Sequence, residues 1–553
     1  MPPGDNIHPT SSVDLHTASS SRHRHRDSGV NKSILNNAIN TRIENSSFVI
    51  NNNQAPAVTA TSFPDSNIDS LNKLYDRVAT NAILNAGGRA DEVKCHPGTR
   101  VDIISIVERW MDSEGNDSST PNLLWLSGPA GAGKSAIMQT IAERCKDRGV
   151  PAFNFFFFRA DPTRSNAQPL VATLLYQIIK VSPLVRQAIA TVLSNDPLLF
   201  AASIQDQFDQ LLSKPLQGTP SLLGYPARRP IVLLIDGLDE CDLRHNLSQK
   251  QIIQAVDHLV VQENSPFLVL VASRAEPQIA MAFKQLASPV QSIFLDDQYA
   301  PEKDIRIFVT GEFNKIKKSH NLAHTLSDSW PSADDTEAIV RKSSGQFIYA
   351  ATVMRFLSNS SANPVLSLER VRGMAPATKN SPFSQLDAIY AYILSQADDQ
   401  EAVKDFLAAK LFRNAADSQK DNLYDRDTPL LSITTILSIY DPSRYNLALL
   451  DSCASDLTAI LQFLGHEMIF YHASFTDFLT DKSRSGDYHI DIPVFAAKVF
   501  PAIWMKAPES KTKANSQYYE GTPDYLASFN RVHCCKLSRR LRNLSKHSQT
   551  LSS

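Results

Sequence analysis

The sequence predicts an α/β fold built on a parallel sheet, followed by all-helical and winged-helix domains. Short apolar runs recur between residues 121 and 300, as expected of strands that are buried on both faces of a parallel sheet. A glycine-rich loop joins the first of these runs to a helix pattern. From Pro301 onward helix patterns follow one another, and they end in a short strand pattern near Met468.

Bulk composition bounds the size and class of the protein. Its 553 residues are too many for one core, so about three or four domains are expected. Apolar residues make up 42% and charged residues 20% of the chain, which is ordinary for a globular protein. The formal net charge is −2, so no overall field points to nucleic acid or to an acidic membrane.

Cysteine usage and hydropathy indicate the compartment. The six cysteines are scattered and form no Cys-x-x-Cys pair, which argues against a disulfide framework or a zinc site and favours a reducing environment. The N-terminus is polar, and no stretch reaches about 18 apolar residues. We therefore expect a cytoplasmic protein that is neither secreted nor membrane-spanning.

The stretch Leu123–Cys145 combines a strand, a loop and a helix. Leu123–Leu126 is apolar, and Ala136–Cys145 consists of good helix formers. Between them, GPAGAGKS fits the phosphate-loop pattern of Gly, four residues, Gly, Lys and Ser or Thr. An ordinary glycine-rich turn is the alternative, but the flanking strand and helix favour nucleotide binding. The candidate nucleotide-binding residues here are Gly128, Pro129, Ala130, Gly131, Ala132, Gly133, Lys134, Ser135 and Ala136.

Polyphosphate binding needs these residue types in this order. Glycines let the backbone turn sharply and bring its N–H groups close to a phosphate at the positive N-terminus of the helix. Lys134 supplies a mobile charge for the β- and γ-phosphates, and Ser135 supplies a hydroxyl for Mg²⁺.

A second landmark is Ile231–Glu240, IVLLIDGLDE, whose apolar run predicts a buried strand. Asp236 follows at the carboxyl edge of the sheet, where its oxygens can hold Mg²⁺. Asp239 and Glu240 are candidates for polarising an attacking water. Acidic residues after a strand often cap a helix or lie in a solvated turn, but the phosphate loop upstream favours the magnesium role for Asp236.

The next strand prediction, Phe267–Val271, places Arg274 just past its end. Arg274 then shares the sheet edge with Asp236, where a cation could reach the γ-phosphate. A plain surface arginine is the alternative. Ser292–Leu295 is expected to be the last strand of the sheet.

Composition and periodicity divide the rest of the first part of the chain. Residues 1–65 predict a disordered leader rich in Asn and Ser, residues 66–120 a helical lead-in with a nucleotide-contacting loop, and residues 121–300 the core. The further elements expected here are helices over 68–90, Val101–Trp110 and Leu170–Ile179 and an aromatic strand over Pro151–Arg159.

After the core, residues 301–400 predict a helical domain, residues 401–485 a winged-helix domain, and residues 486–553 a tail that is partly helical or disordered. The expected elements are helices over Lys303–Phe313, Phe347–Leu357, Leu386–Leu394, Val403–Phe412, Leu430–Ile439 and Ala454–Leu464 and a strand over Met468–His472.

These stretches resemble the NACHT class of signal-transduction ATPases, within the STAND group of P-loop NTPases, and in particular the NLR-like proteins of fungi. The resemblance covers roughly residues 90–485, and the motifs occur in the order typical of the family. The matching stretches are KCHPGTR (94–100), LLWLSGPAGAGKSAI (123–137), IVLLIDGLDEC (231–241), ASRAEP (272–277), SGQFIYAATVMRFL (344–357) and FYHASFTDFLTD (470–481).

The resemblance implies roles for the acidic and phosphate-loop residues. Lys134 and Ser135 look like the Walker A pair, and Asp236 looks like the Walker B ligand of Mg²⁺. Asp239 and Glu240 look like the additional acidic residues that NACHT segments carry.

The resemblance also implies roles outside these two motifs. Arg274 looks like sensor 1, and Thr99 and Arg100 fall where the family has a loop near the adenine and ribose. His472 looks like the winged-helix histidine that contacts the β-phosphate of ADP and locks a closed state. From the residues alone, His472 would be a hydrogen-bonded histidine of the core.

The implied function is a switch that binds ATP or ADP with Mg²⁺, hydrolyses the nucleotide slowly, and forms a homo-oligomer or binds a partner protein. GTP also fits the motifs, and binding to nucleic acid is not indicated. The alternatives are an AAA+-like motor ATPase and a non-enzymatic scaffold that holds the nucleotide structurally. One departure stands out: neither the C-terminal repeat array nor the N-terminal effector domain of the family is visible in the sequence.

Overall fold

The computed structural model describes residues 65–85, 93–112, 120–216, 230–241, 246–262, 265–374, 383–417, 432–455, 457–464 and 467–506. The chain divides into two units, Met1–Ser62 and Phe63–Ser553, and every described residue lies in the second. The predicted leader therefore lies outside the described residues, apart from Asp65, and so does the predicted tail beyond Lys506.

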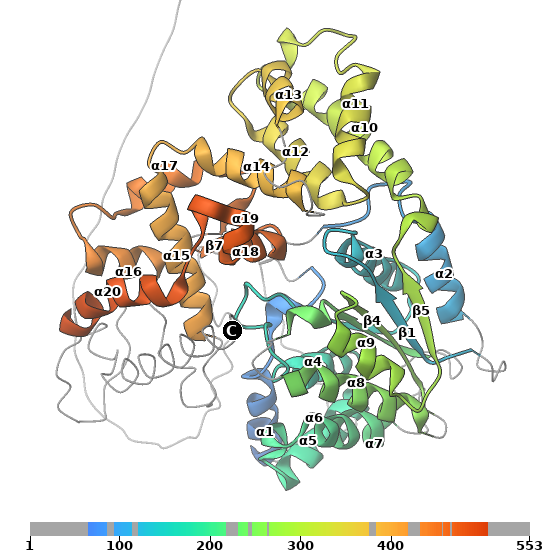
Figure 1. Ribbon diagram of the computed structural model, residues 1–553. Coiled ribbons are helices and arrows are strands. Elements are labelled where there is room, and N and C mark those ends of the chain that lie inside the picture. The colour runs from blue at the N-terminus through green and yellow to red at the C-terminus, as the bar shows by residue number, and fades with distance from the viewer. Residues whose placement is uncertain are drawn as a thin grey trace, which may run out of the picture. The chain divides into compact units, whose positions relative to one another are not determined.

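Five parallel strands form the sheet that the sequence predicts (Figure 1). They are β1 (Leu123–Ser127), β2 (Ala152–Phe156), β3 (Ile231–Asp236), β4 (Phe267–Ser273) and β5 (Val290–Phe294), in the spatial order β2-β3-β4-β1-β5. Because all five run in one direction, their carboxyl ends meet at one edge. β4 lies between β1 and β3, so Arg274 follows a strand that separates the phosphate loop from Asp236.

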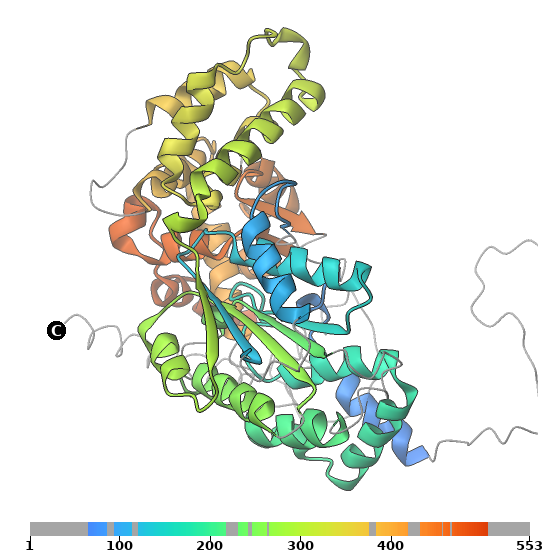
Figure 2. The same cartoon turned by 90° about the vertical axis from the view of Figure 1, so that its right-hand side faces the viewer.

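Helices cover both faces of the sheet (Figures 1 and 2). Side chains alternate between the faces, so Leu124 and Leu234 pack with one helix layer and Leu123 and Leu233 with the other. The first layer is α2 (Val101–Asp112) and α3 (Lys134–Asp147). The second is α1 (Asp65–Tyr75), α4 (Leu170–Val181), α5 (Pro183–Asn195), α6 (Ile204–Phe208), α7 (Lys214–Leu216), α8 (Asn246–Val261) and α9 (Pro277–Lys284). Burial on both sides explains the unbroken apolar runs of the strands.

The region after the sheet is mostly helical, as predicted. One cluster of buried residues runs from Ile305 to Ile503, so these helices share a continuous core. The helices are α10 (Pro301–Ser319), α11 (Ala333–Ser343), α12 (Phe347–Asn359), α13 (Pro364–Gly373), α14 (Ser384–Ser395), α15 (Gln400–Asp417), α16 (Ile433–Tyr440), α17 (Leu447–Ser455), α18 (Ala473–Thr480), α19 (Lys482–Ser485) and α20 (Ile492–Lys506). The strands β6 (Leu461–Leu464) and β7 (Glu467–Phe470) form an antiparallel pair. Three helices, α15 to α17, precede this pair, in the order predicted for a winged helix, and the winged-helix designation itself stays a prediction.

Two helix predictions were wrong, and tertiary contacts explain both. The helix expected over 68–90 ends at Tyr75, because the backbone N–H groups of Ala79 and Leu84 bond to side chains of α4 and β2 instead of continuing the helix. The helix expected over Ala454–Leu464 is the end of α17 followed by β6. The spacing of its apolar residues is compatible with a helix or with a strand, and the pairing of β6 with β7 selects the strand.

None of the helices in the described part of the chain combines the length and the apolar character that crossing a membrane requires.

Candidate nucleotide-binding site

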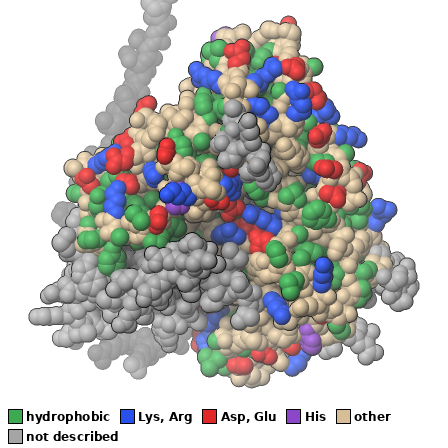
Figure 3. Space-filling view, viewed as in Figure 1, with side chains coloured by type: hydrophobic (Ala, Val, Ile, Leu, Met, Phe, Trp, Pro, Cys, Tyr) green, Lys and Arg blue, Asp and Glu red, His purple; other side chains and the backbone are tan. Residues whose placement is uncertain are grey.

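The carboxyl edge of the sheet borders a cavity of about 320 Å³. Side chains of α10, α12 and the segment between β7 and α18 line its opposite side. Acidic and basic side chains lie close together in the hollowed middle of the face shown in Figure 3. The sequence-predicted residues that line the cavity are Thr99, Arg100, Ala130, Gly131, Gly133, Lys134, Ser135, Ala136, Asp236, Asp239, Glu240, Arg274 and His472.

The other three predicted residues do not line the cavity, but each supports a residue that does. Lys134 Nζ donates hydrogen bonds to the carbonyl oxygens of Gly128 (2.8 Å) and Pro129 (2.9 Å). Arg100 Nη2 donates to the carbonyl oxygen of Ala132 (2.8 Å). Burial lowers the pKa of Lys134, and the nearby charge of Asp239 opposes this shift.

The phosphate loop has the backbone that its glycines allow. Gly131 (φ 76°) and Gly133 (φ 92°) lie in the left-handed region, and Ala132 N donates to Pro129 O (3.3 Å) to close the turn. Helix α3 begins directly afterwards at Lys134. The first N–H groups of a helix have no partner inside it, so this loop presents backbone donors and Lys134 to the cavity. Such a donor set suits a polyphosphate.

Helix α12 packs against this loop. Ile348 N donates to Gly131 O (3.4 Å), and a Cβ placed on Gly131 would lie 2.2 Å from Ile348 Cγ2. The helical region therefore contacts the phosphate loop so closely that only glycine fits at this position.

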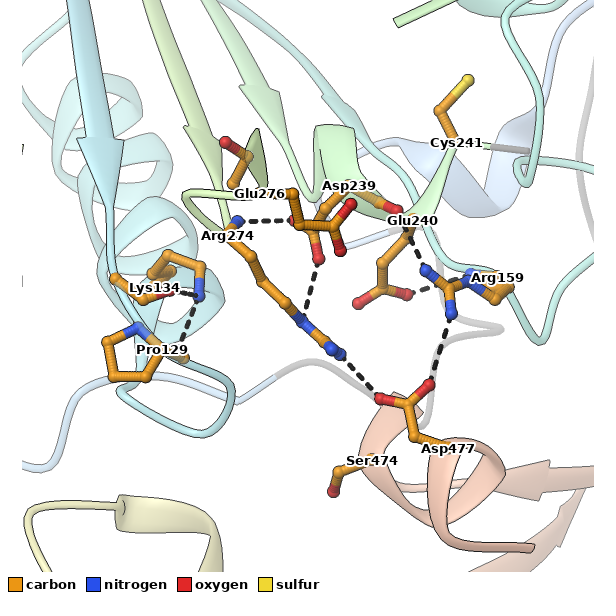
Figure 4. Close-up of polar contacts among 12 residues, drawn as sticks. Pro129, Lys134, Arg159, Asp239, Glu240, Cys241, Arg274, Glu276, Ser474 and Asp477 are labelled. Carbon is orange, nitrogen blue, oxygen red and sulfur yellow. Dashed lines mark hydrogen bonds and ion pairs between the residues drawn. The ribbon is translucent and has the colours of Figure 1, made fainter. Parts of the chain in front are cut away.

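Arg274 is held by the acidic segment that follows β3. Its backbone N donates to Asp239 Oδ1 (2.9 Å), and its Nε lies 3.1 Å from Asp239 Oδ2 (Figure 4). Burial alone would lower the pKa of Arg274, but the charges of Asp477 and Asp239 outweigh it and raise the pKa. Arg274 is thus a firmly charged cation at the cavity wall.

A carboxylate of α18 completes this network. Asp477 Oδ2 accepts from Arg274 Nη2 (2.9 Å), and Asp477 Oδ1 accepts from Arg159 Nη1 (3.3 Å). Arg159 in turn donates from Nη2 to the carbonyl oxygen of Asp239 (3.0 Å). Figure 4 shows both guanidinium groups pointing at Asp477. Two arginines of the sheet edge are therefore tied to the segment that directly follows His472.

Glu240 is the most perturbed acid of the site. Its Oε2 accepts from the backbone N of Arg159 (3.0 Å). Burial, and next the charge of Asp239, raises the pKa of Glu240 to about 8. At neutral pH the protonated form of Glu240 therefore predominates.

His472 is fixed in one tautomer. The backbone N of Ser474 donates to His472 Nδ1 (3.0 Å), so this nitrogen must be an acceptor. The hydroxyl of Ser474 lies 2.7 Å from the same nitrogen and 2.9 Å from the hydroxyl of Tyr390. The neutral ring therefore carries its proton on Nε2, where it can donate to a ligand in the cavity. Burial, and next the charge of Arg274, lowers the pKa of His472 to about 3, so the ring is neutral at physiological pH.

Thr99 and Arg100 lie at the part of the cavity lined by α10 and α12. Arg100 N donates to Asp304 Oδ2 (3.0 Å), and its guanidinium carbon lies 4.9 Å from the ring centre of Phe347. Thr99 Oγ1 donates to the carbonyl oxygen of His96 (2.7 Å). Both side chains help to position this wall.

Ser135 and Asp236 both line the cavity and offer the hard oxygen ligands that Mg²⁺ prefers. In the described part of the chain, no cluster of three or more His, Cys, Asp or Glu could hold a metal ion without further ligands. A hydroxyl and a carboxylate that share Mg²⁺ with phosphate oxygens need no such cluster, so the residues present fit the ion.

Comparisons with known proteins point to the same region. The family model described as Nephrocystin 3, N-terminal, matches residues 105–274. The vegetative incompatibility protein HET-E-1 of Podospora anserina is 24% identical over 318 residues, which is 53% of this chain and 20% of that protein. The chain thus spans about a fifth of the length of this curated relative.

These matches support a NACHT-type P-loop NTPase domain in this chain. The phosphate loop, the parallel sheet and the matched relatives agree on it.

Three solved structures match parts of the chain at low similarity. The Walker-type ATPase of Pyrococcus abyssi is 11% identical, covering 69% of this chain and 96% of its own, with a TM-score of 0.33. The Drosophila ORC bound to DNA is 13% identical, covering 66% of this chain and 91% of its own, with a TM-score of 0.29. The AMPPCP-bound DnaA from Aquifex aeolicus is 12% identical, covering 61% of this chain and 99% of its own, with a TM-score of 0.25. Scores this low say nothing further about the NACHT domain.

Sequence reasoning missed three groups of this NACHT site. Asp477 lies within the quoted stretch FYHASFTDFLTD, and Arg159 ends the predicted aromatic strand. The charge of Arg159 at the end of a predicted strand was an available signal, but the pairing of Asp477 with Arg159 joins segments 318 positions apart. Tyr390 bonds to Ser474 from a buried position in α14, and nothing in its local pattern indicates a polar partner.

Lys134→Ala is expected to weaken ADP binding by about 100-fold, because a charge-assisted contact to phosphate contributes about 1.5–3 kcal/mol. Isothermal titration calorimetry measures this change. The matched control is Lys146→Ala, an exposed lysine near the end of the same helix, which should bind as the wild type does. Unchanged binding by Lys134→Ala would remove the nucleotide assignment.

His472→Ala is expected to speed ADP release by about tenfold, because the variant loses one Nε2–H donor. Stopped-flow fluorescence with a labelled ADP measures the dissociation rate. His258→Ala on α8 serves as the control, since its side chain is 55% exposed. An unaltered off-rate would exclude His472 from contact with the nucleotide.

Proposed function

We propose that this protein is a signal-transduction switch that is closed with ADP bound and able to assemble with ATP bound. Assembly forms a homo-oligomer or a complex with a partner protein, and GTP is the second candidate nucleotide. One observation carries the proposal: Asp477 on α18 pairs with Arg274 and Arg159 at the cavity, and α18 begins next to His472.

In this proposal different residues bind the phosphates, the Mg²⁺ ion, and the base and ribose. Lys134 and the backbone donors of the loop hold the phosphates, while Ser135 and Asp236 hold Mg²⁺. Bound Mg²⁺ would neutralise phosphate charge. Thr99, Arg100 and the apolar side chains of α10 and α12 enclose the base and ribose, and the Nε2–H of His472 donates to a phosphate oxygen.

The two states of the proposed switch differ in the partner of Arg274. Its Nη2 donor can serve Asp477 or a terminal phosphate oxygen, and sharing weakens both bonds. If Arg274 turns to the phosphate, Asp477 loses its nearer partner while it is still mostly buried, at 19% exposure. Leaving a buried carboxylate without its partner is costly, so α18 would move away from the sheet edge.

The energies involved are of the right size. Inverting a two-state population from 1:99 to 99:1 requires about 5.5 kcal/mol of differential binding. A hydrogen bond to a charged group contributes about 1.5–3 kcal/mol. The two bonds of Asp477, together with the donor of His472, can therefore supply the difference.

Slow hydrolysis fits the state of the catalytic candidates. A protonated Glu240 cannot take a proton from water. Asp239 forms an ion pair with Arg274 and is therefore not positioned to act as the base instead. Hydrolysis in this closed form would be slow until Glu240 loses its proton.

Asp477→Asn is expected to make assembly independent of the ATP state. Asn keeps the shape of Asp477 but removes the charge that holds Arg274 and Arg159, so the closed form loses stability. Size-exclusion chromatography with light scattering should show a mass increase already in ADP, whereas the wild type increases only with a non-hydrolysable ATP analogue. Asp451→Asn, at an exposed position on α17, is the control.

The wild type measured in ADP and in the ATP analogue tests the switch directly. Equal masses in ADP and in the analogue would contradict the switch and favour a scaffold with a structural nucleotide. Turnover stimulated by DNA would favour an AAA+-like motor instead.

Hydrolysis is expected to accelerate between pH 7 and 9. The pKa of Glu240 is raised to about 8, so the carboxylate that can accept a proton becomes the main form only above this pH. Phosphate-release assays at saturating nucleotide measure the profile. Glu240→Gln should abolish the rise, and a rise that persists in Glu240→Gln would assign the base to another group.

A further inference from the structure

Helix α12 lines the cavity along its length, not only at the phosphate loop. The side chains that it contributes are Phe347, Ile348, Ala351, Met354 and Arg355, a spacing that keeps them on one face of a helix. Ile348 contacts the phosphate loop, and Arg355 lies two turns further along the helix. The helix therefore brings a cation to the cavity from the helical region.

Arg355 is held in place by the segments around β6 and β7. Its Nε donates to the carbonyl oxygen of Ala459 (3.2 Å), and its guanidinium carbon lies 4.4 Å from the ring centre of Tyr471. Tyr471 itself lines the cavity beside His472. These two contacts fix the plane of the guanidinium and leave its two Nη groups for other partners.

Arg355 forms no ion pair with any residue that the structure describes, and the charge of Glu312, which also lines the cavity, offsets its burial only in part. The other arginines at comparable depth have one: Arg274 pairs with Asp239 and Asp477, and Arg484 pairs with Asp387. Burial lowers the pKa of Arg355, and the charge of Arg355 contributes to the lowered pKa of His472, so the two side chains are neighbours. A buried cation without an ion-pair partner is costly, and its position at a cavity indicates that the occupant supplies an anion.

We propose that Arg355 is a phosphate ligand, whose Nη groups bind an oxygen of a nucleoside diphosphate or triphosphate in this cavity. The inference rests on the proposed function, because that function places the nucleotide here. The phosphates are then held from three sides: by Lys134 on α3, by Arg355 on α12 and by His472 before α18. Since Arg355 also bonds to Ala459 and stacks on Tyr471, phosphate binding joins α12 to the β6–β7 pair.

The test compares a nucleotide with its nucleoside. Arg355→Gln in the full chain is expected to raise the Kd of ADP by about 10- to 100-fold, and to leave the Kd of adenosine within about twofold. Isothermal titration calorimetry measures both constants. Arg341→Gln, an exposed arginine of α11 with a side chain 71% exposed, should bind both as the wild type does.

The outcomes separate the proposal from its alternatives. An unchanged Kd of ADP in Arg355→Gln overturns it, and an equal loss for ADP and adenosine assigns Arg355 a merely structural role. If Arg355→Gln does not fold, Arg355→Lys replaces it: the charge remains but the fork is lost, so a several-fold weaker binding of ADP is expected and an unchanged Kd contradicts the proposal. A wild-type chain that binds no nucleotide at all refutes the proposed function instead.

Discussion

The whole site depends on one constraint: a parallel sheet that is buried on both faces can present polar groups only at its ends. In this chain the carboxyl ends of β1, β3 and β4 meet at one edge. The phosphate loop, the acidic segment after Asp236 and Arg274 therefore lie together, although they come from three separate segments of the chain. The faces of β1 to β4 are packed against helices, which leaves this edge for polar groups.

Charge balance at this edge links the sheet to the helical region. Asp239 satisfies Arg274 from within the sheet, and Asp477 satisfies Arg274 and Arg159 from α18. The pKa of Glu240 rises and that of His472 falls, because burial penalises the charged form of each. Both groups are thus mainly neutral at physiological pH, whereas the raised pKa of Arg274 keeps this guanidinium charged beside them. A ligand that alters this balance alters the contact between the two regions.

The helical region is itself one body by its packing. A continuous core extends from α10 to α20, so a displacement of α18 cannot stay local to that helix. Helix α12 touches the phosphate loop at Ile348 and the β6–β7 pair through Arg355. The proposed coupling between nucleotide and assembly would have a physical route along α12, in addition to the route through Asp477.

Local sequence determined the elements that rest on short-range chemistry. The strands β1, β3 and β4 begin as unbroken apolar runs, and the phosphate loop is a fixed order of glycines, Lys134 and Ser135. Asp236 and Arg274 come just past the ends of predicted strands. Only the tertiary structure decided the rest. Strand order, the partners of Asp477, the tautomer of His472 and the surroundings of Arg355 all depend on contacts between segments far apart in the chain. Ala454–Leu464 shows the same limit within an element, since its apolar spacing suits helix or strand and the pairing with β7 decides. The hydrophobic periodicity of a segment shows which of its residues can be buried. The polar partner of a residue depends instead on which segments pack against it.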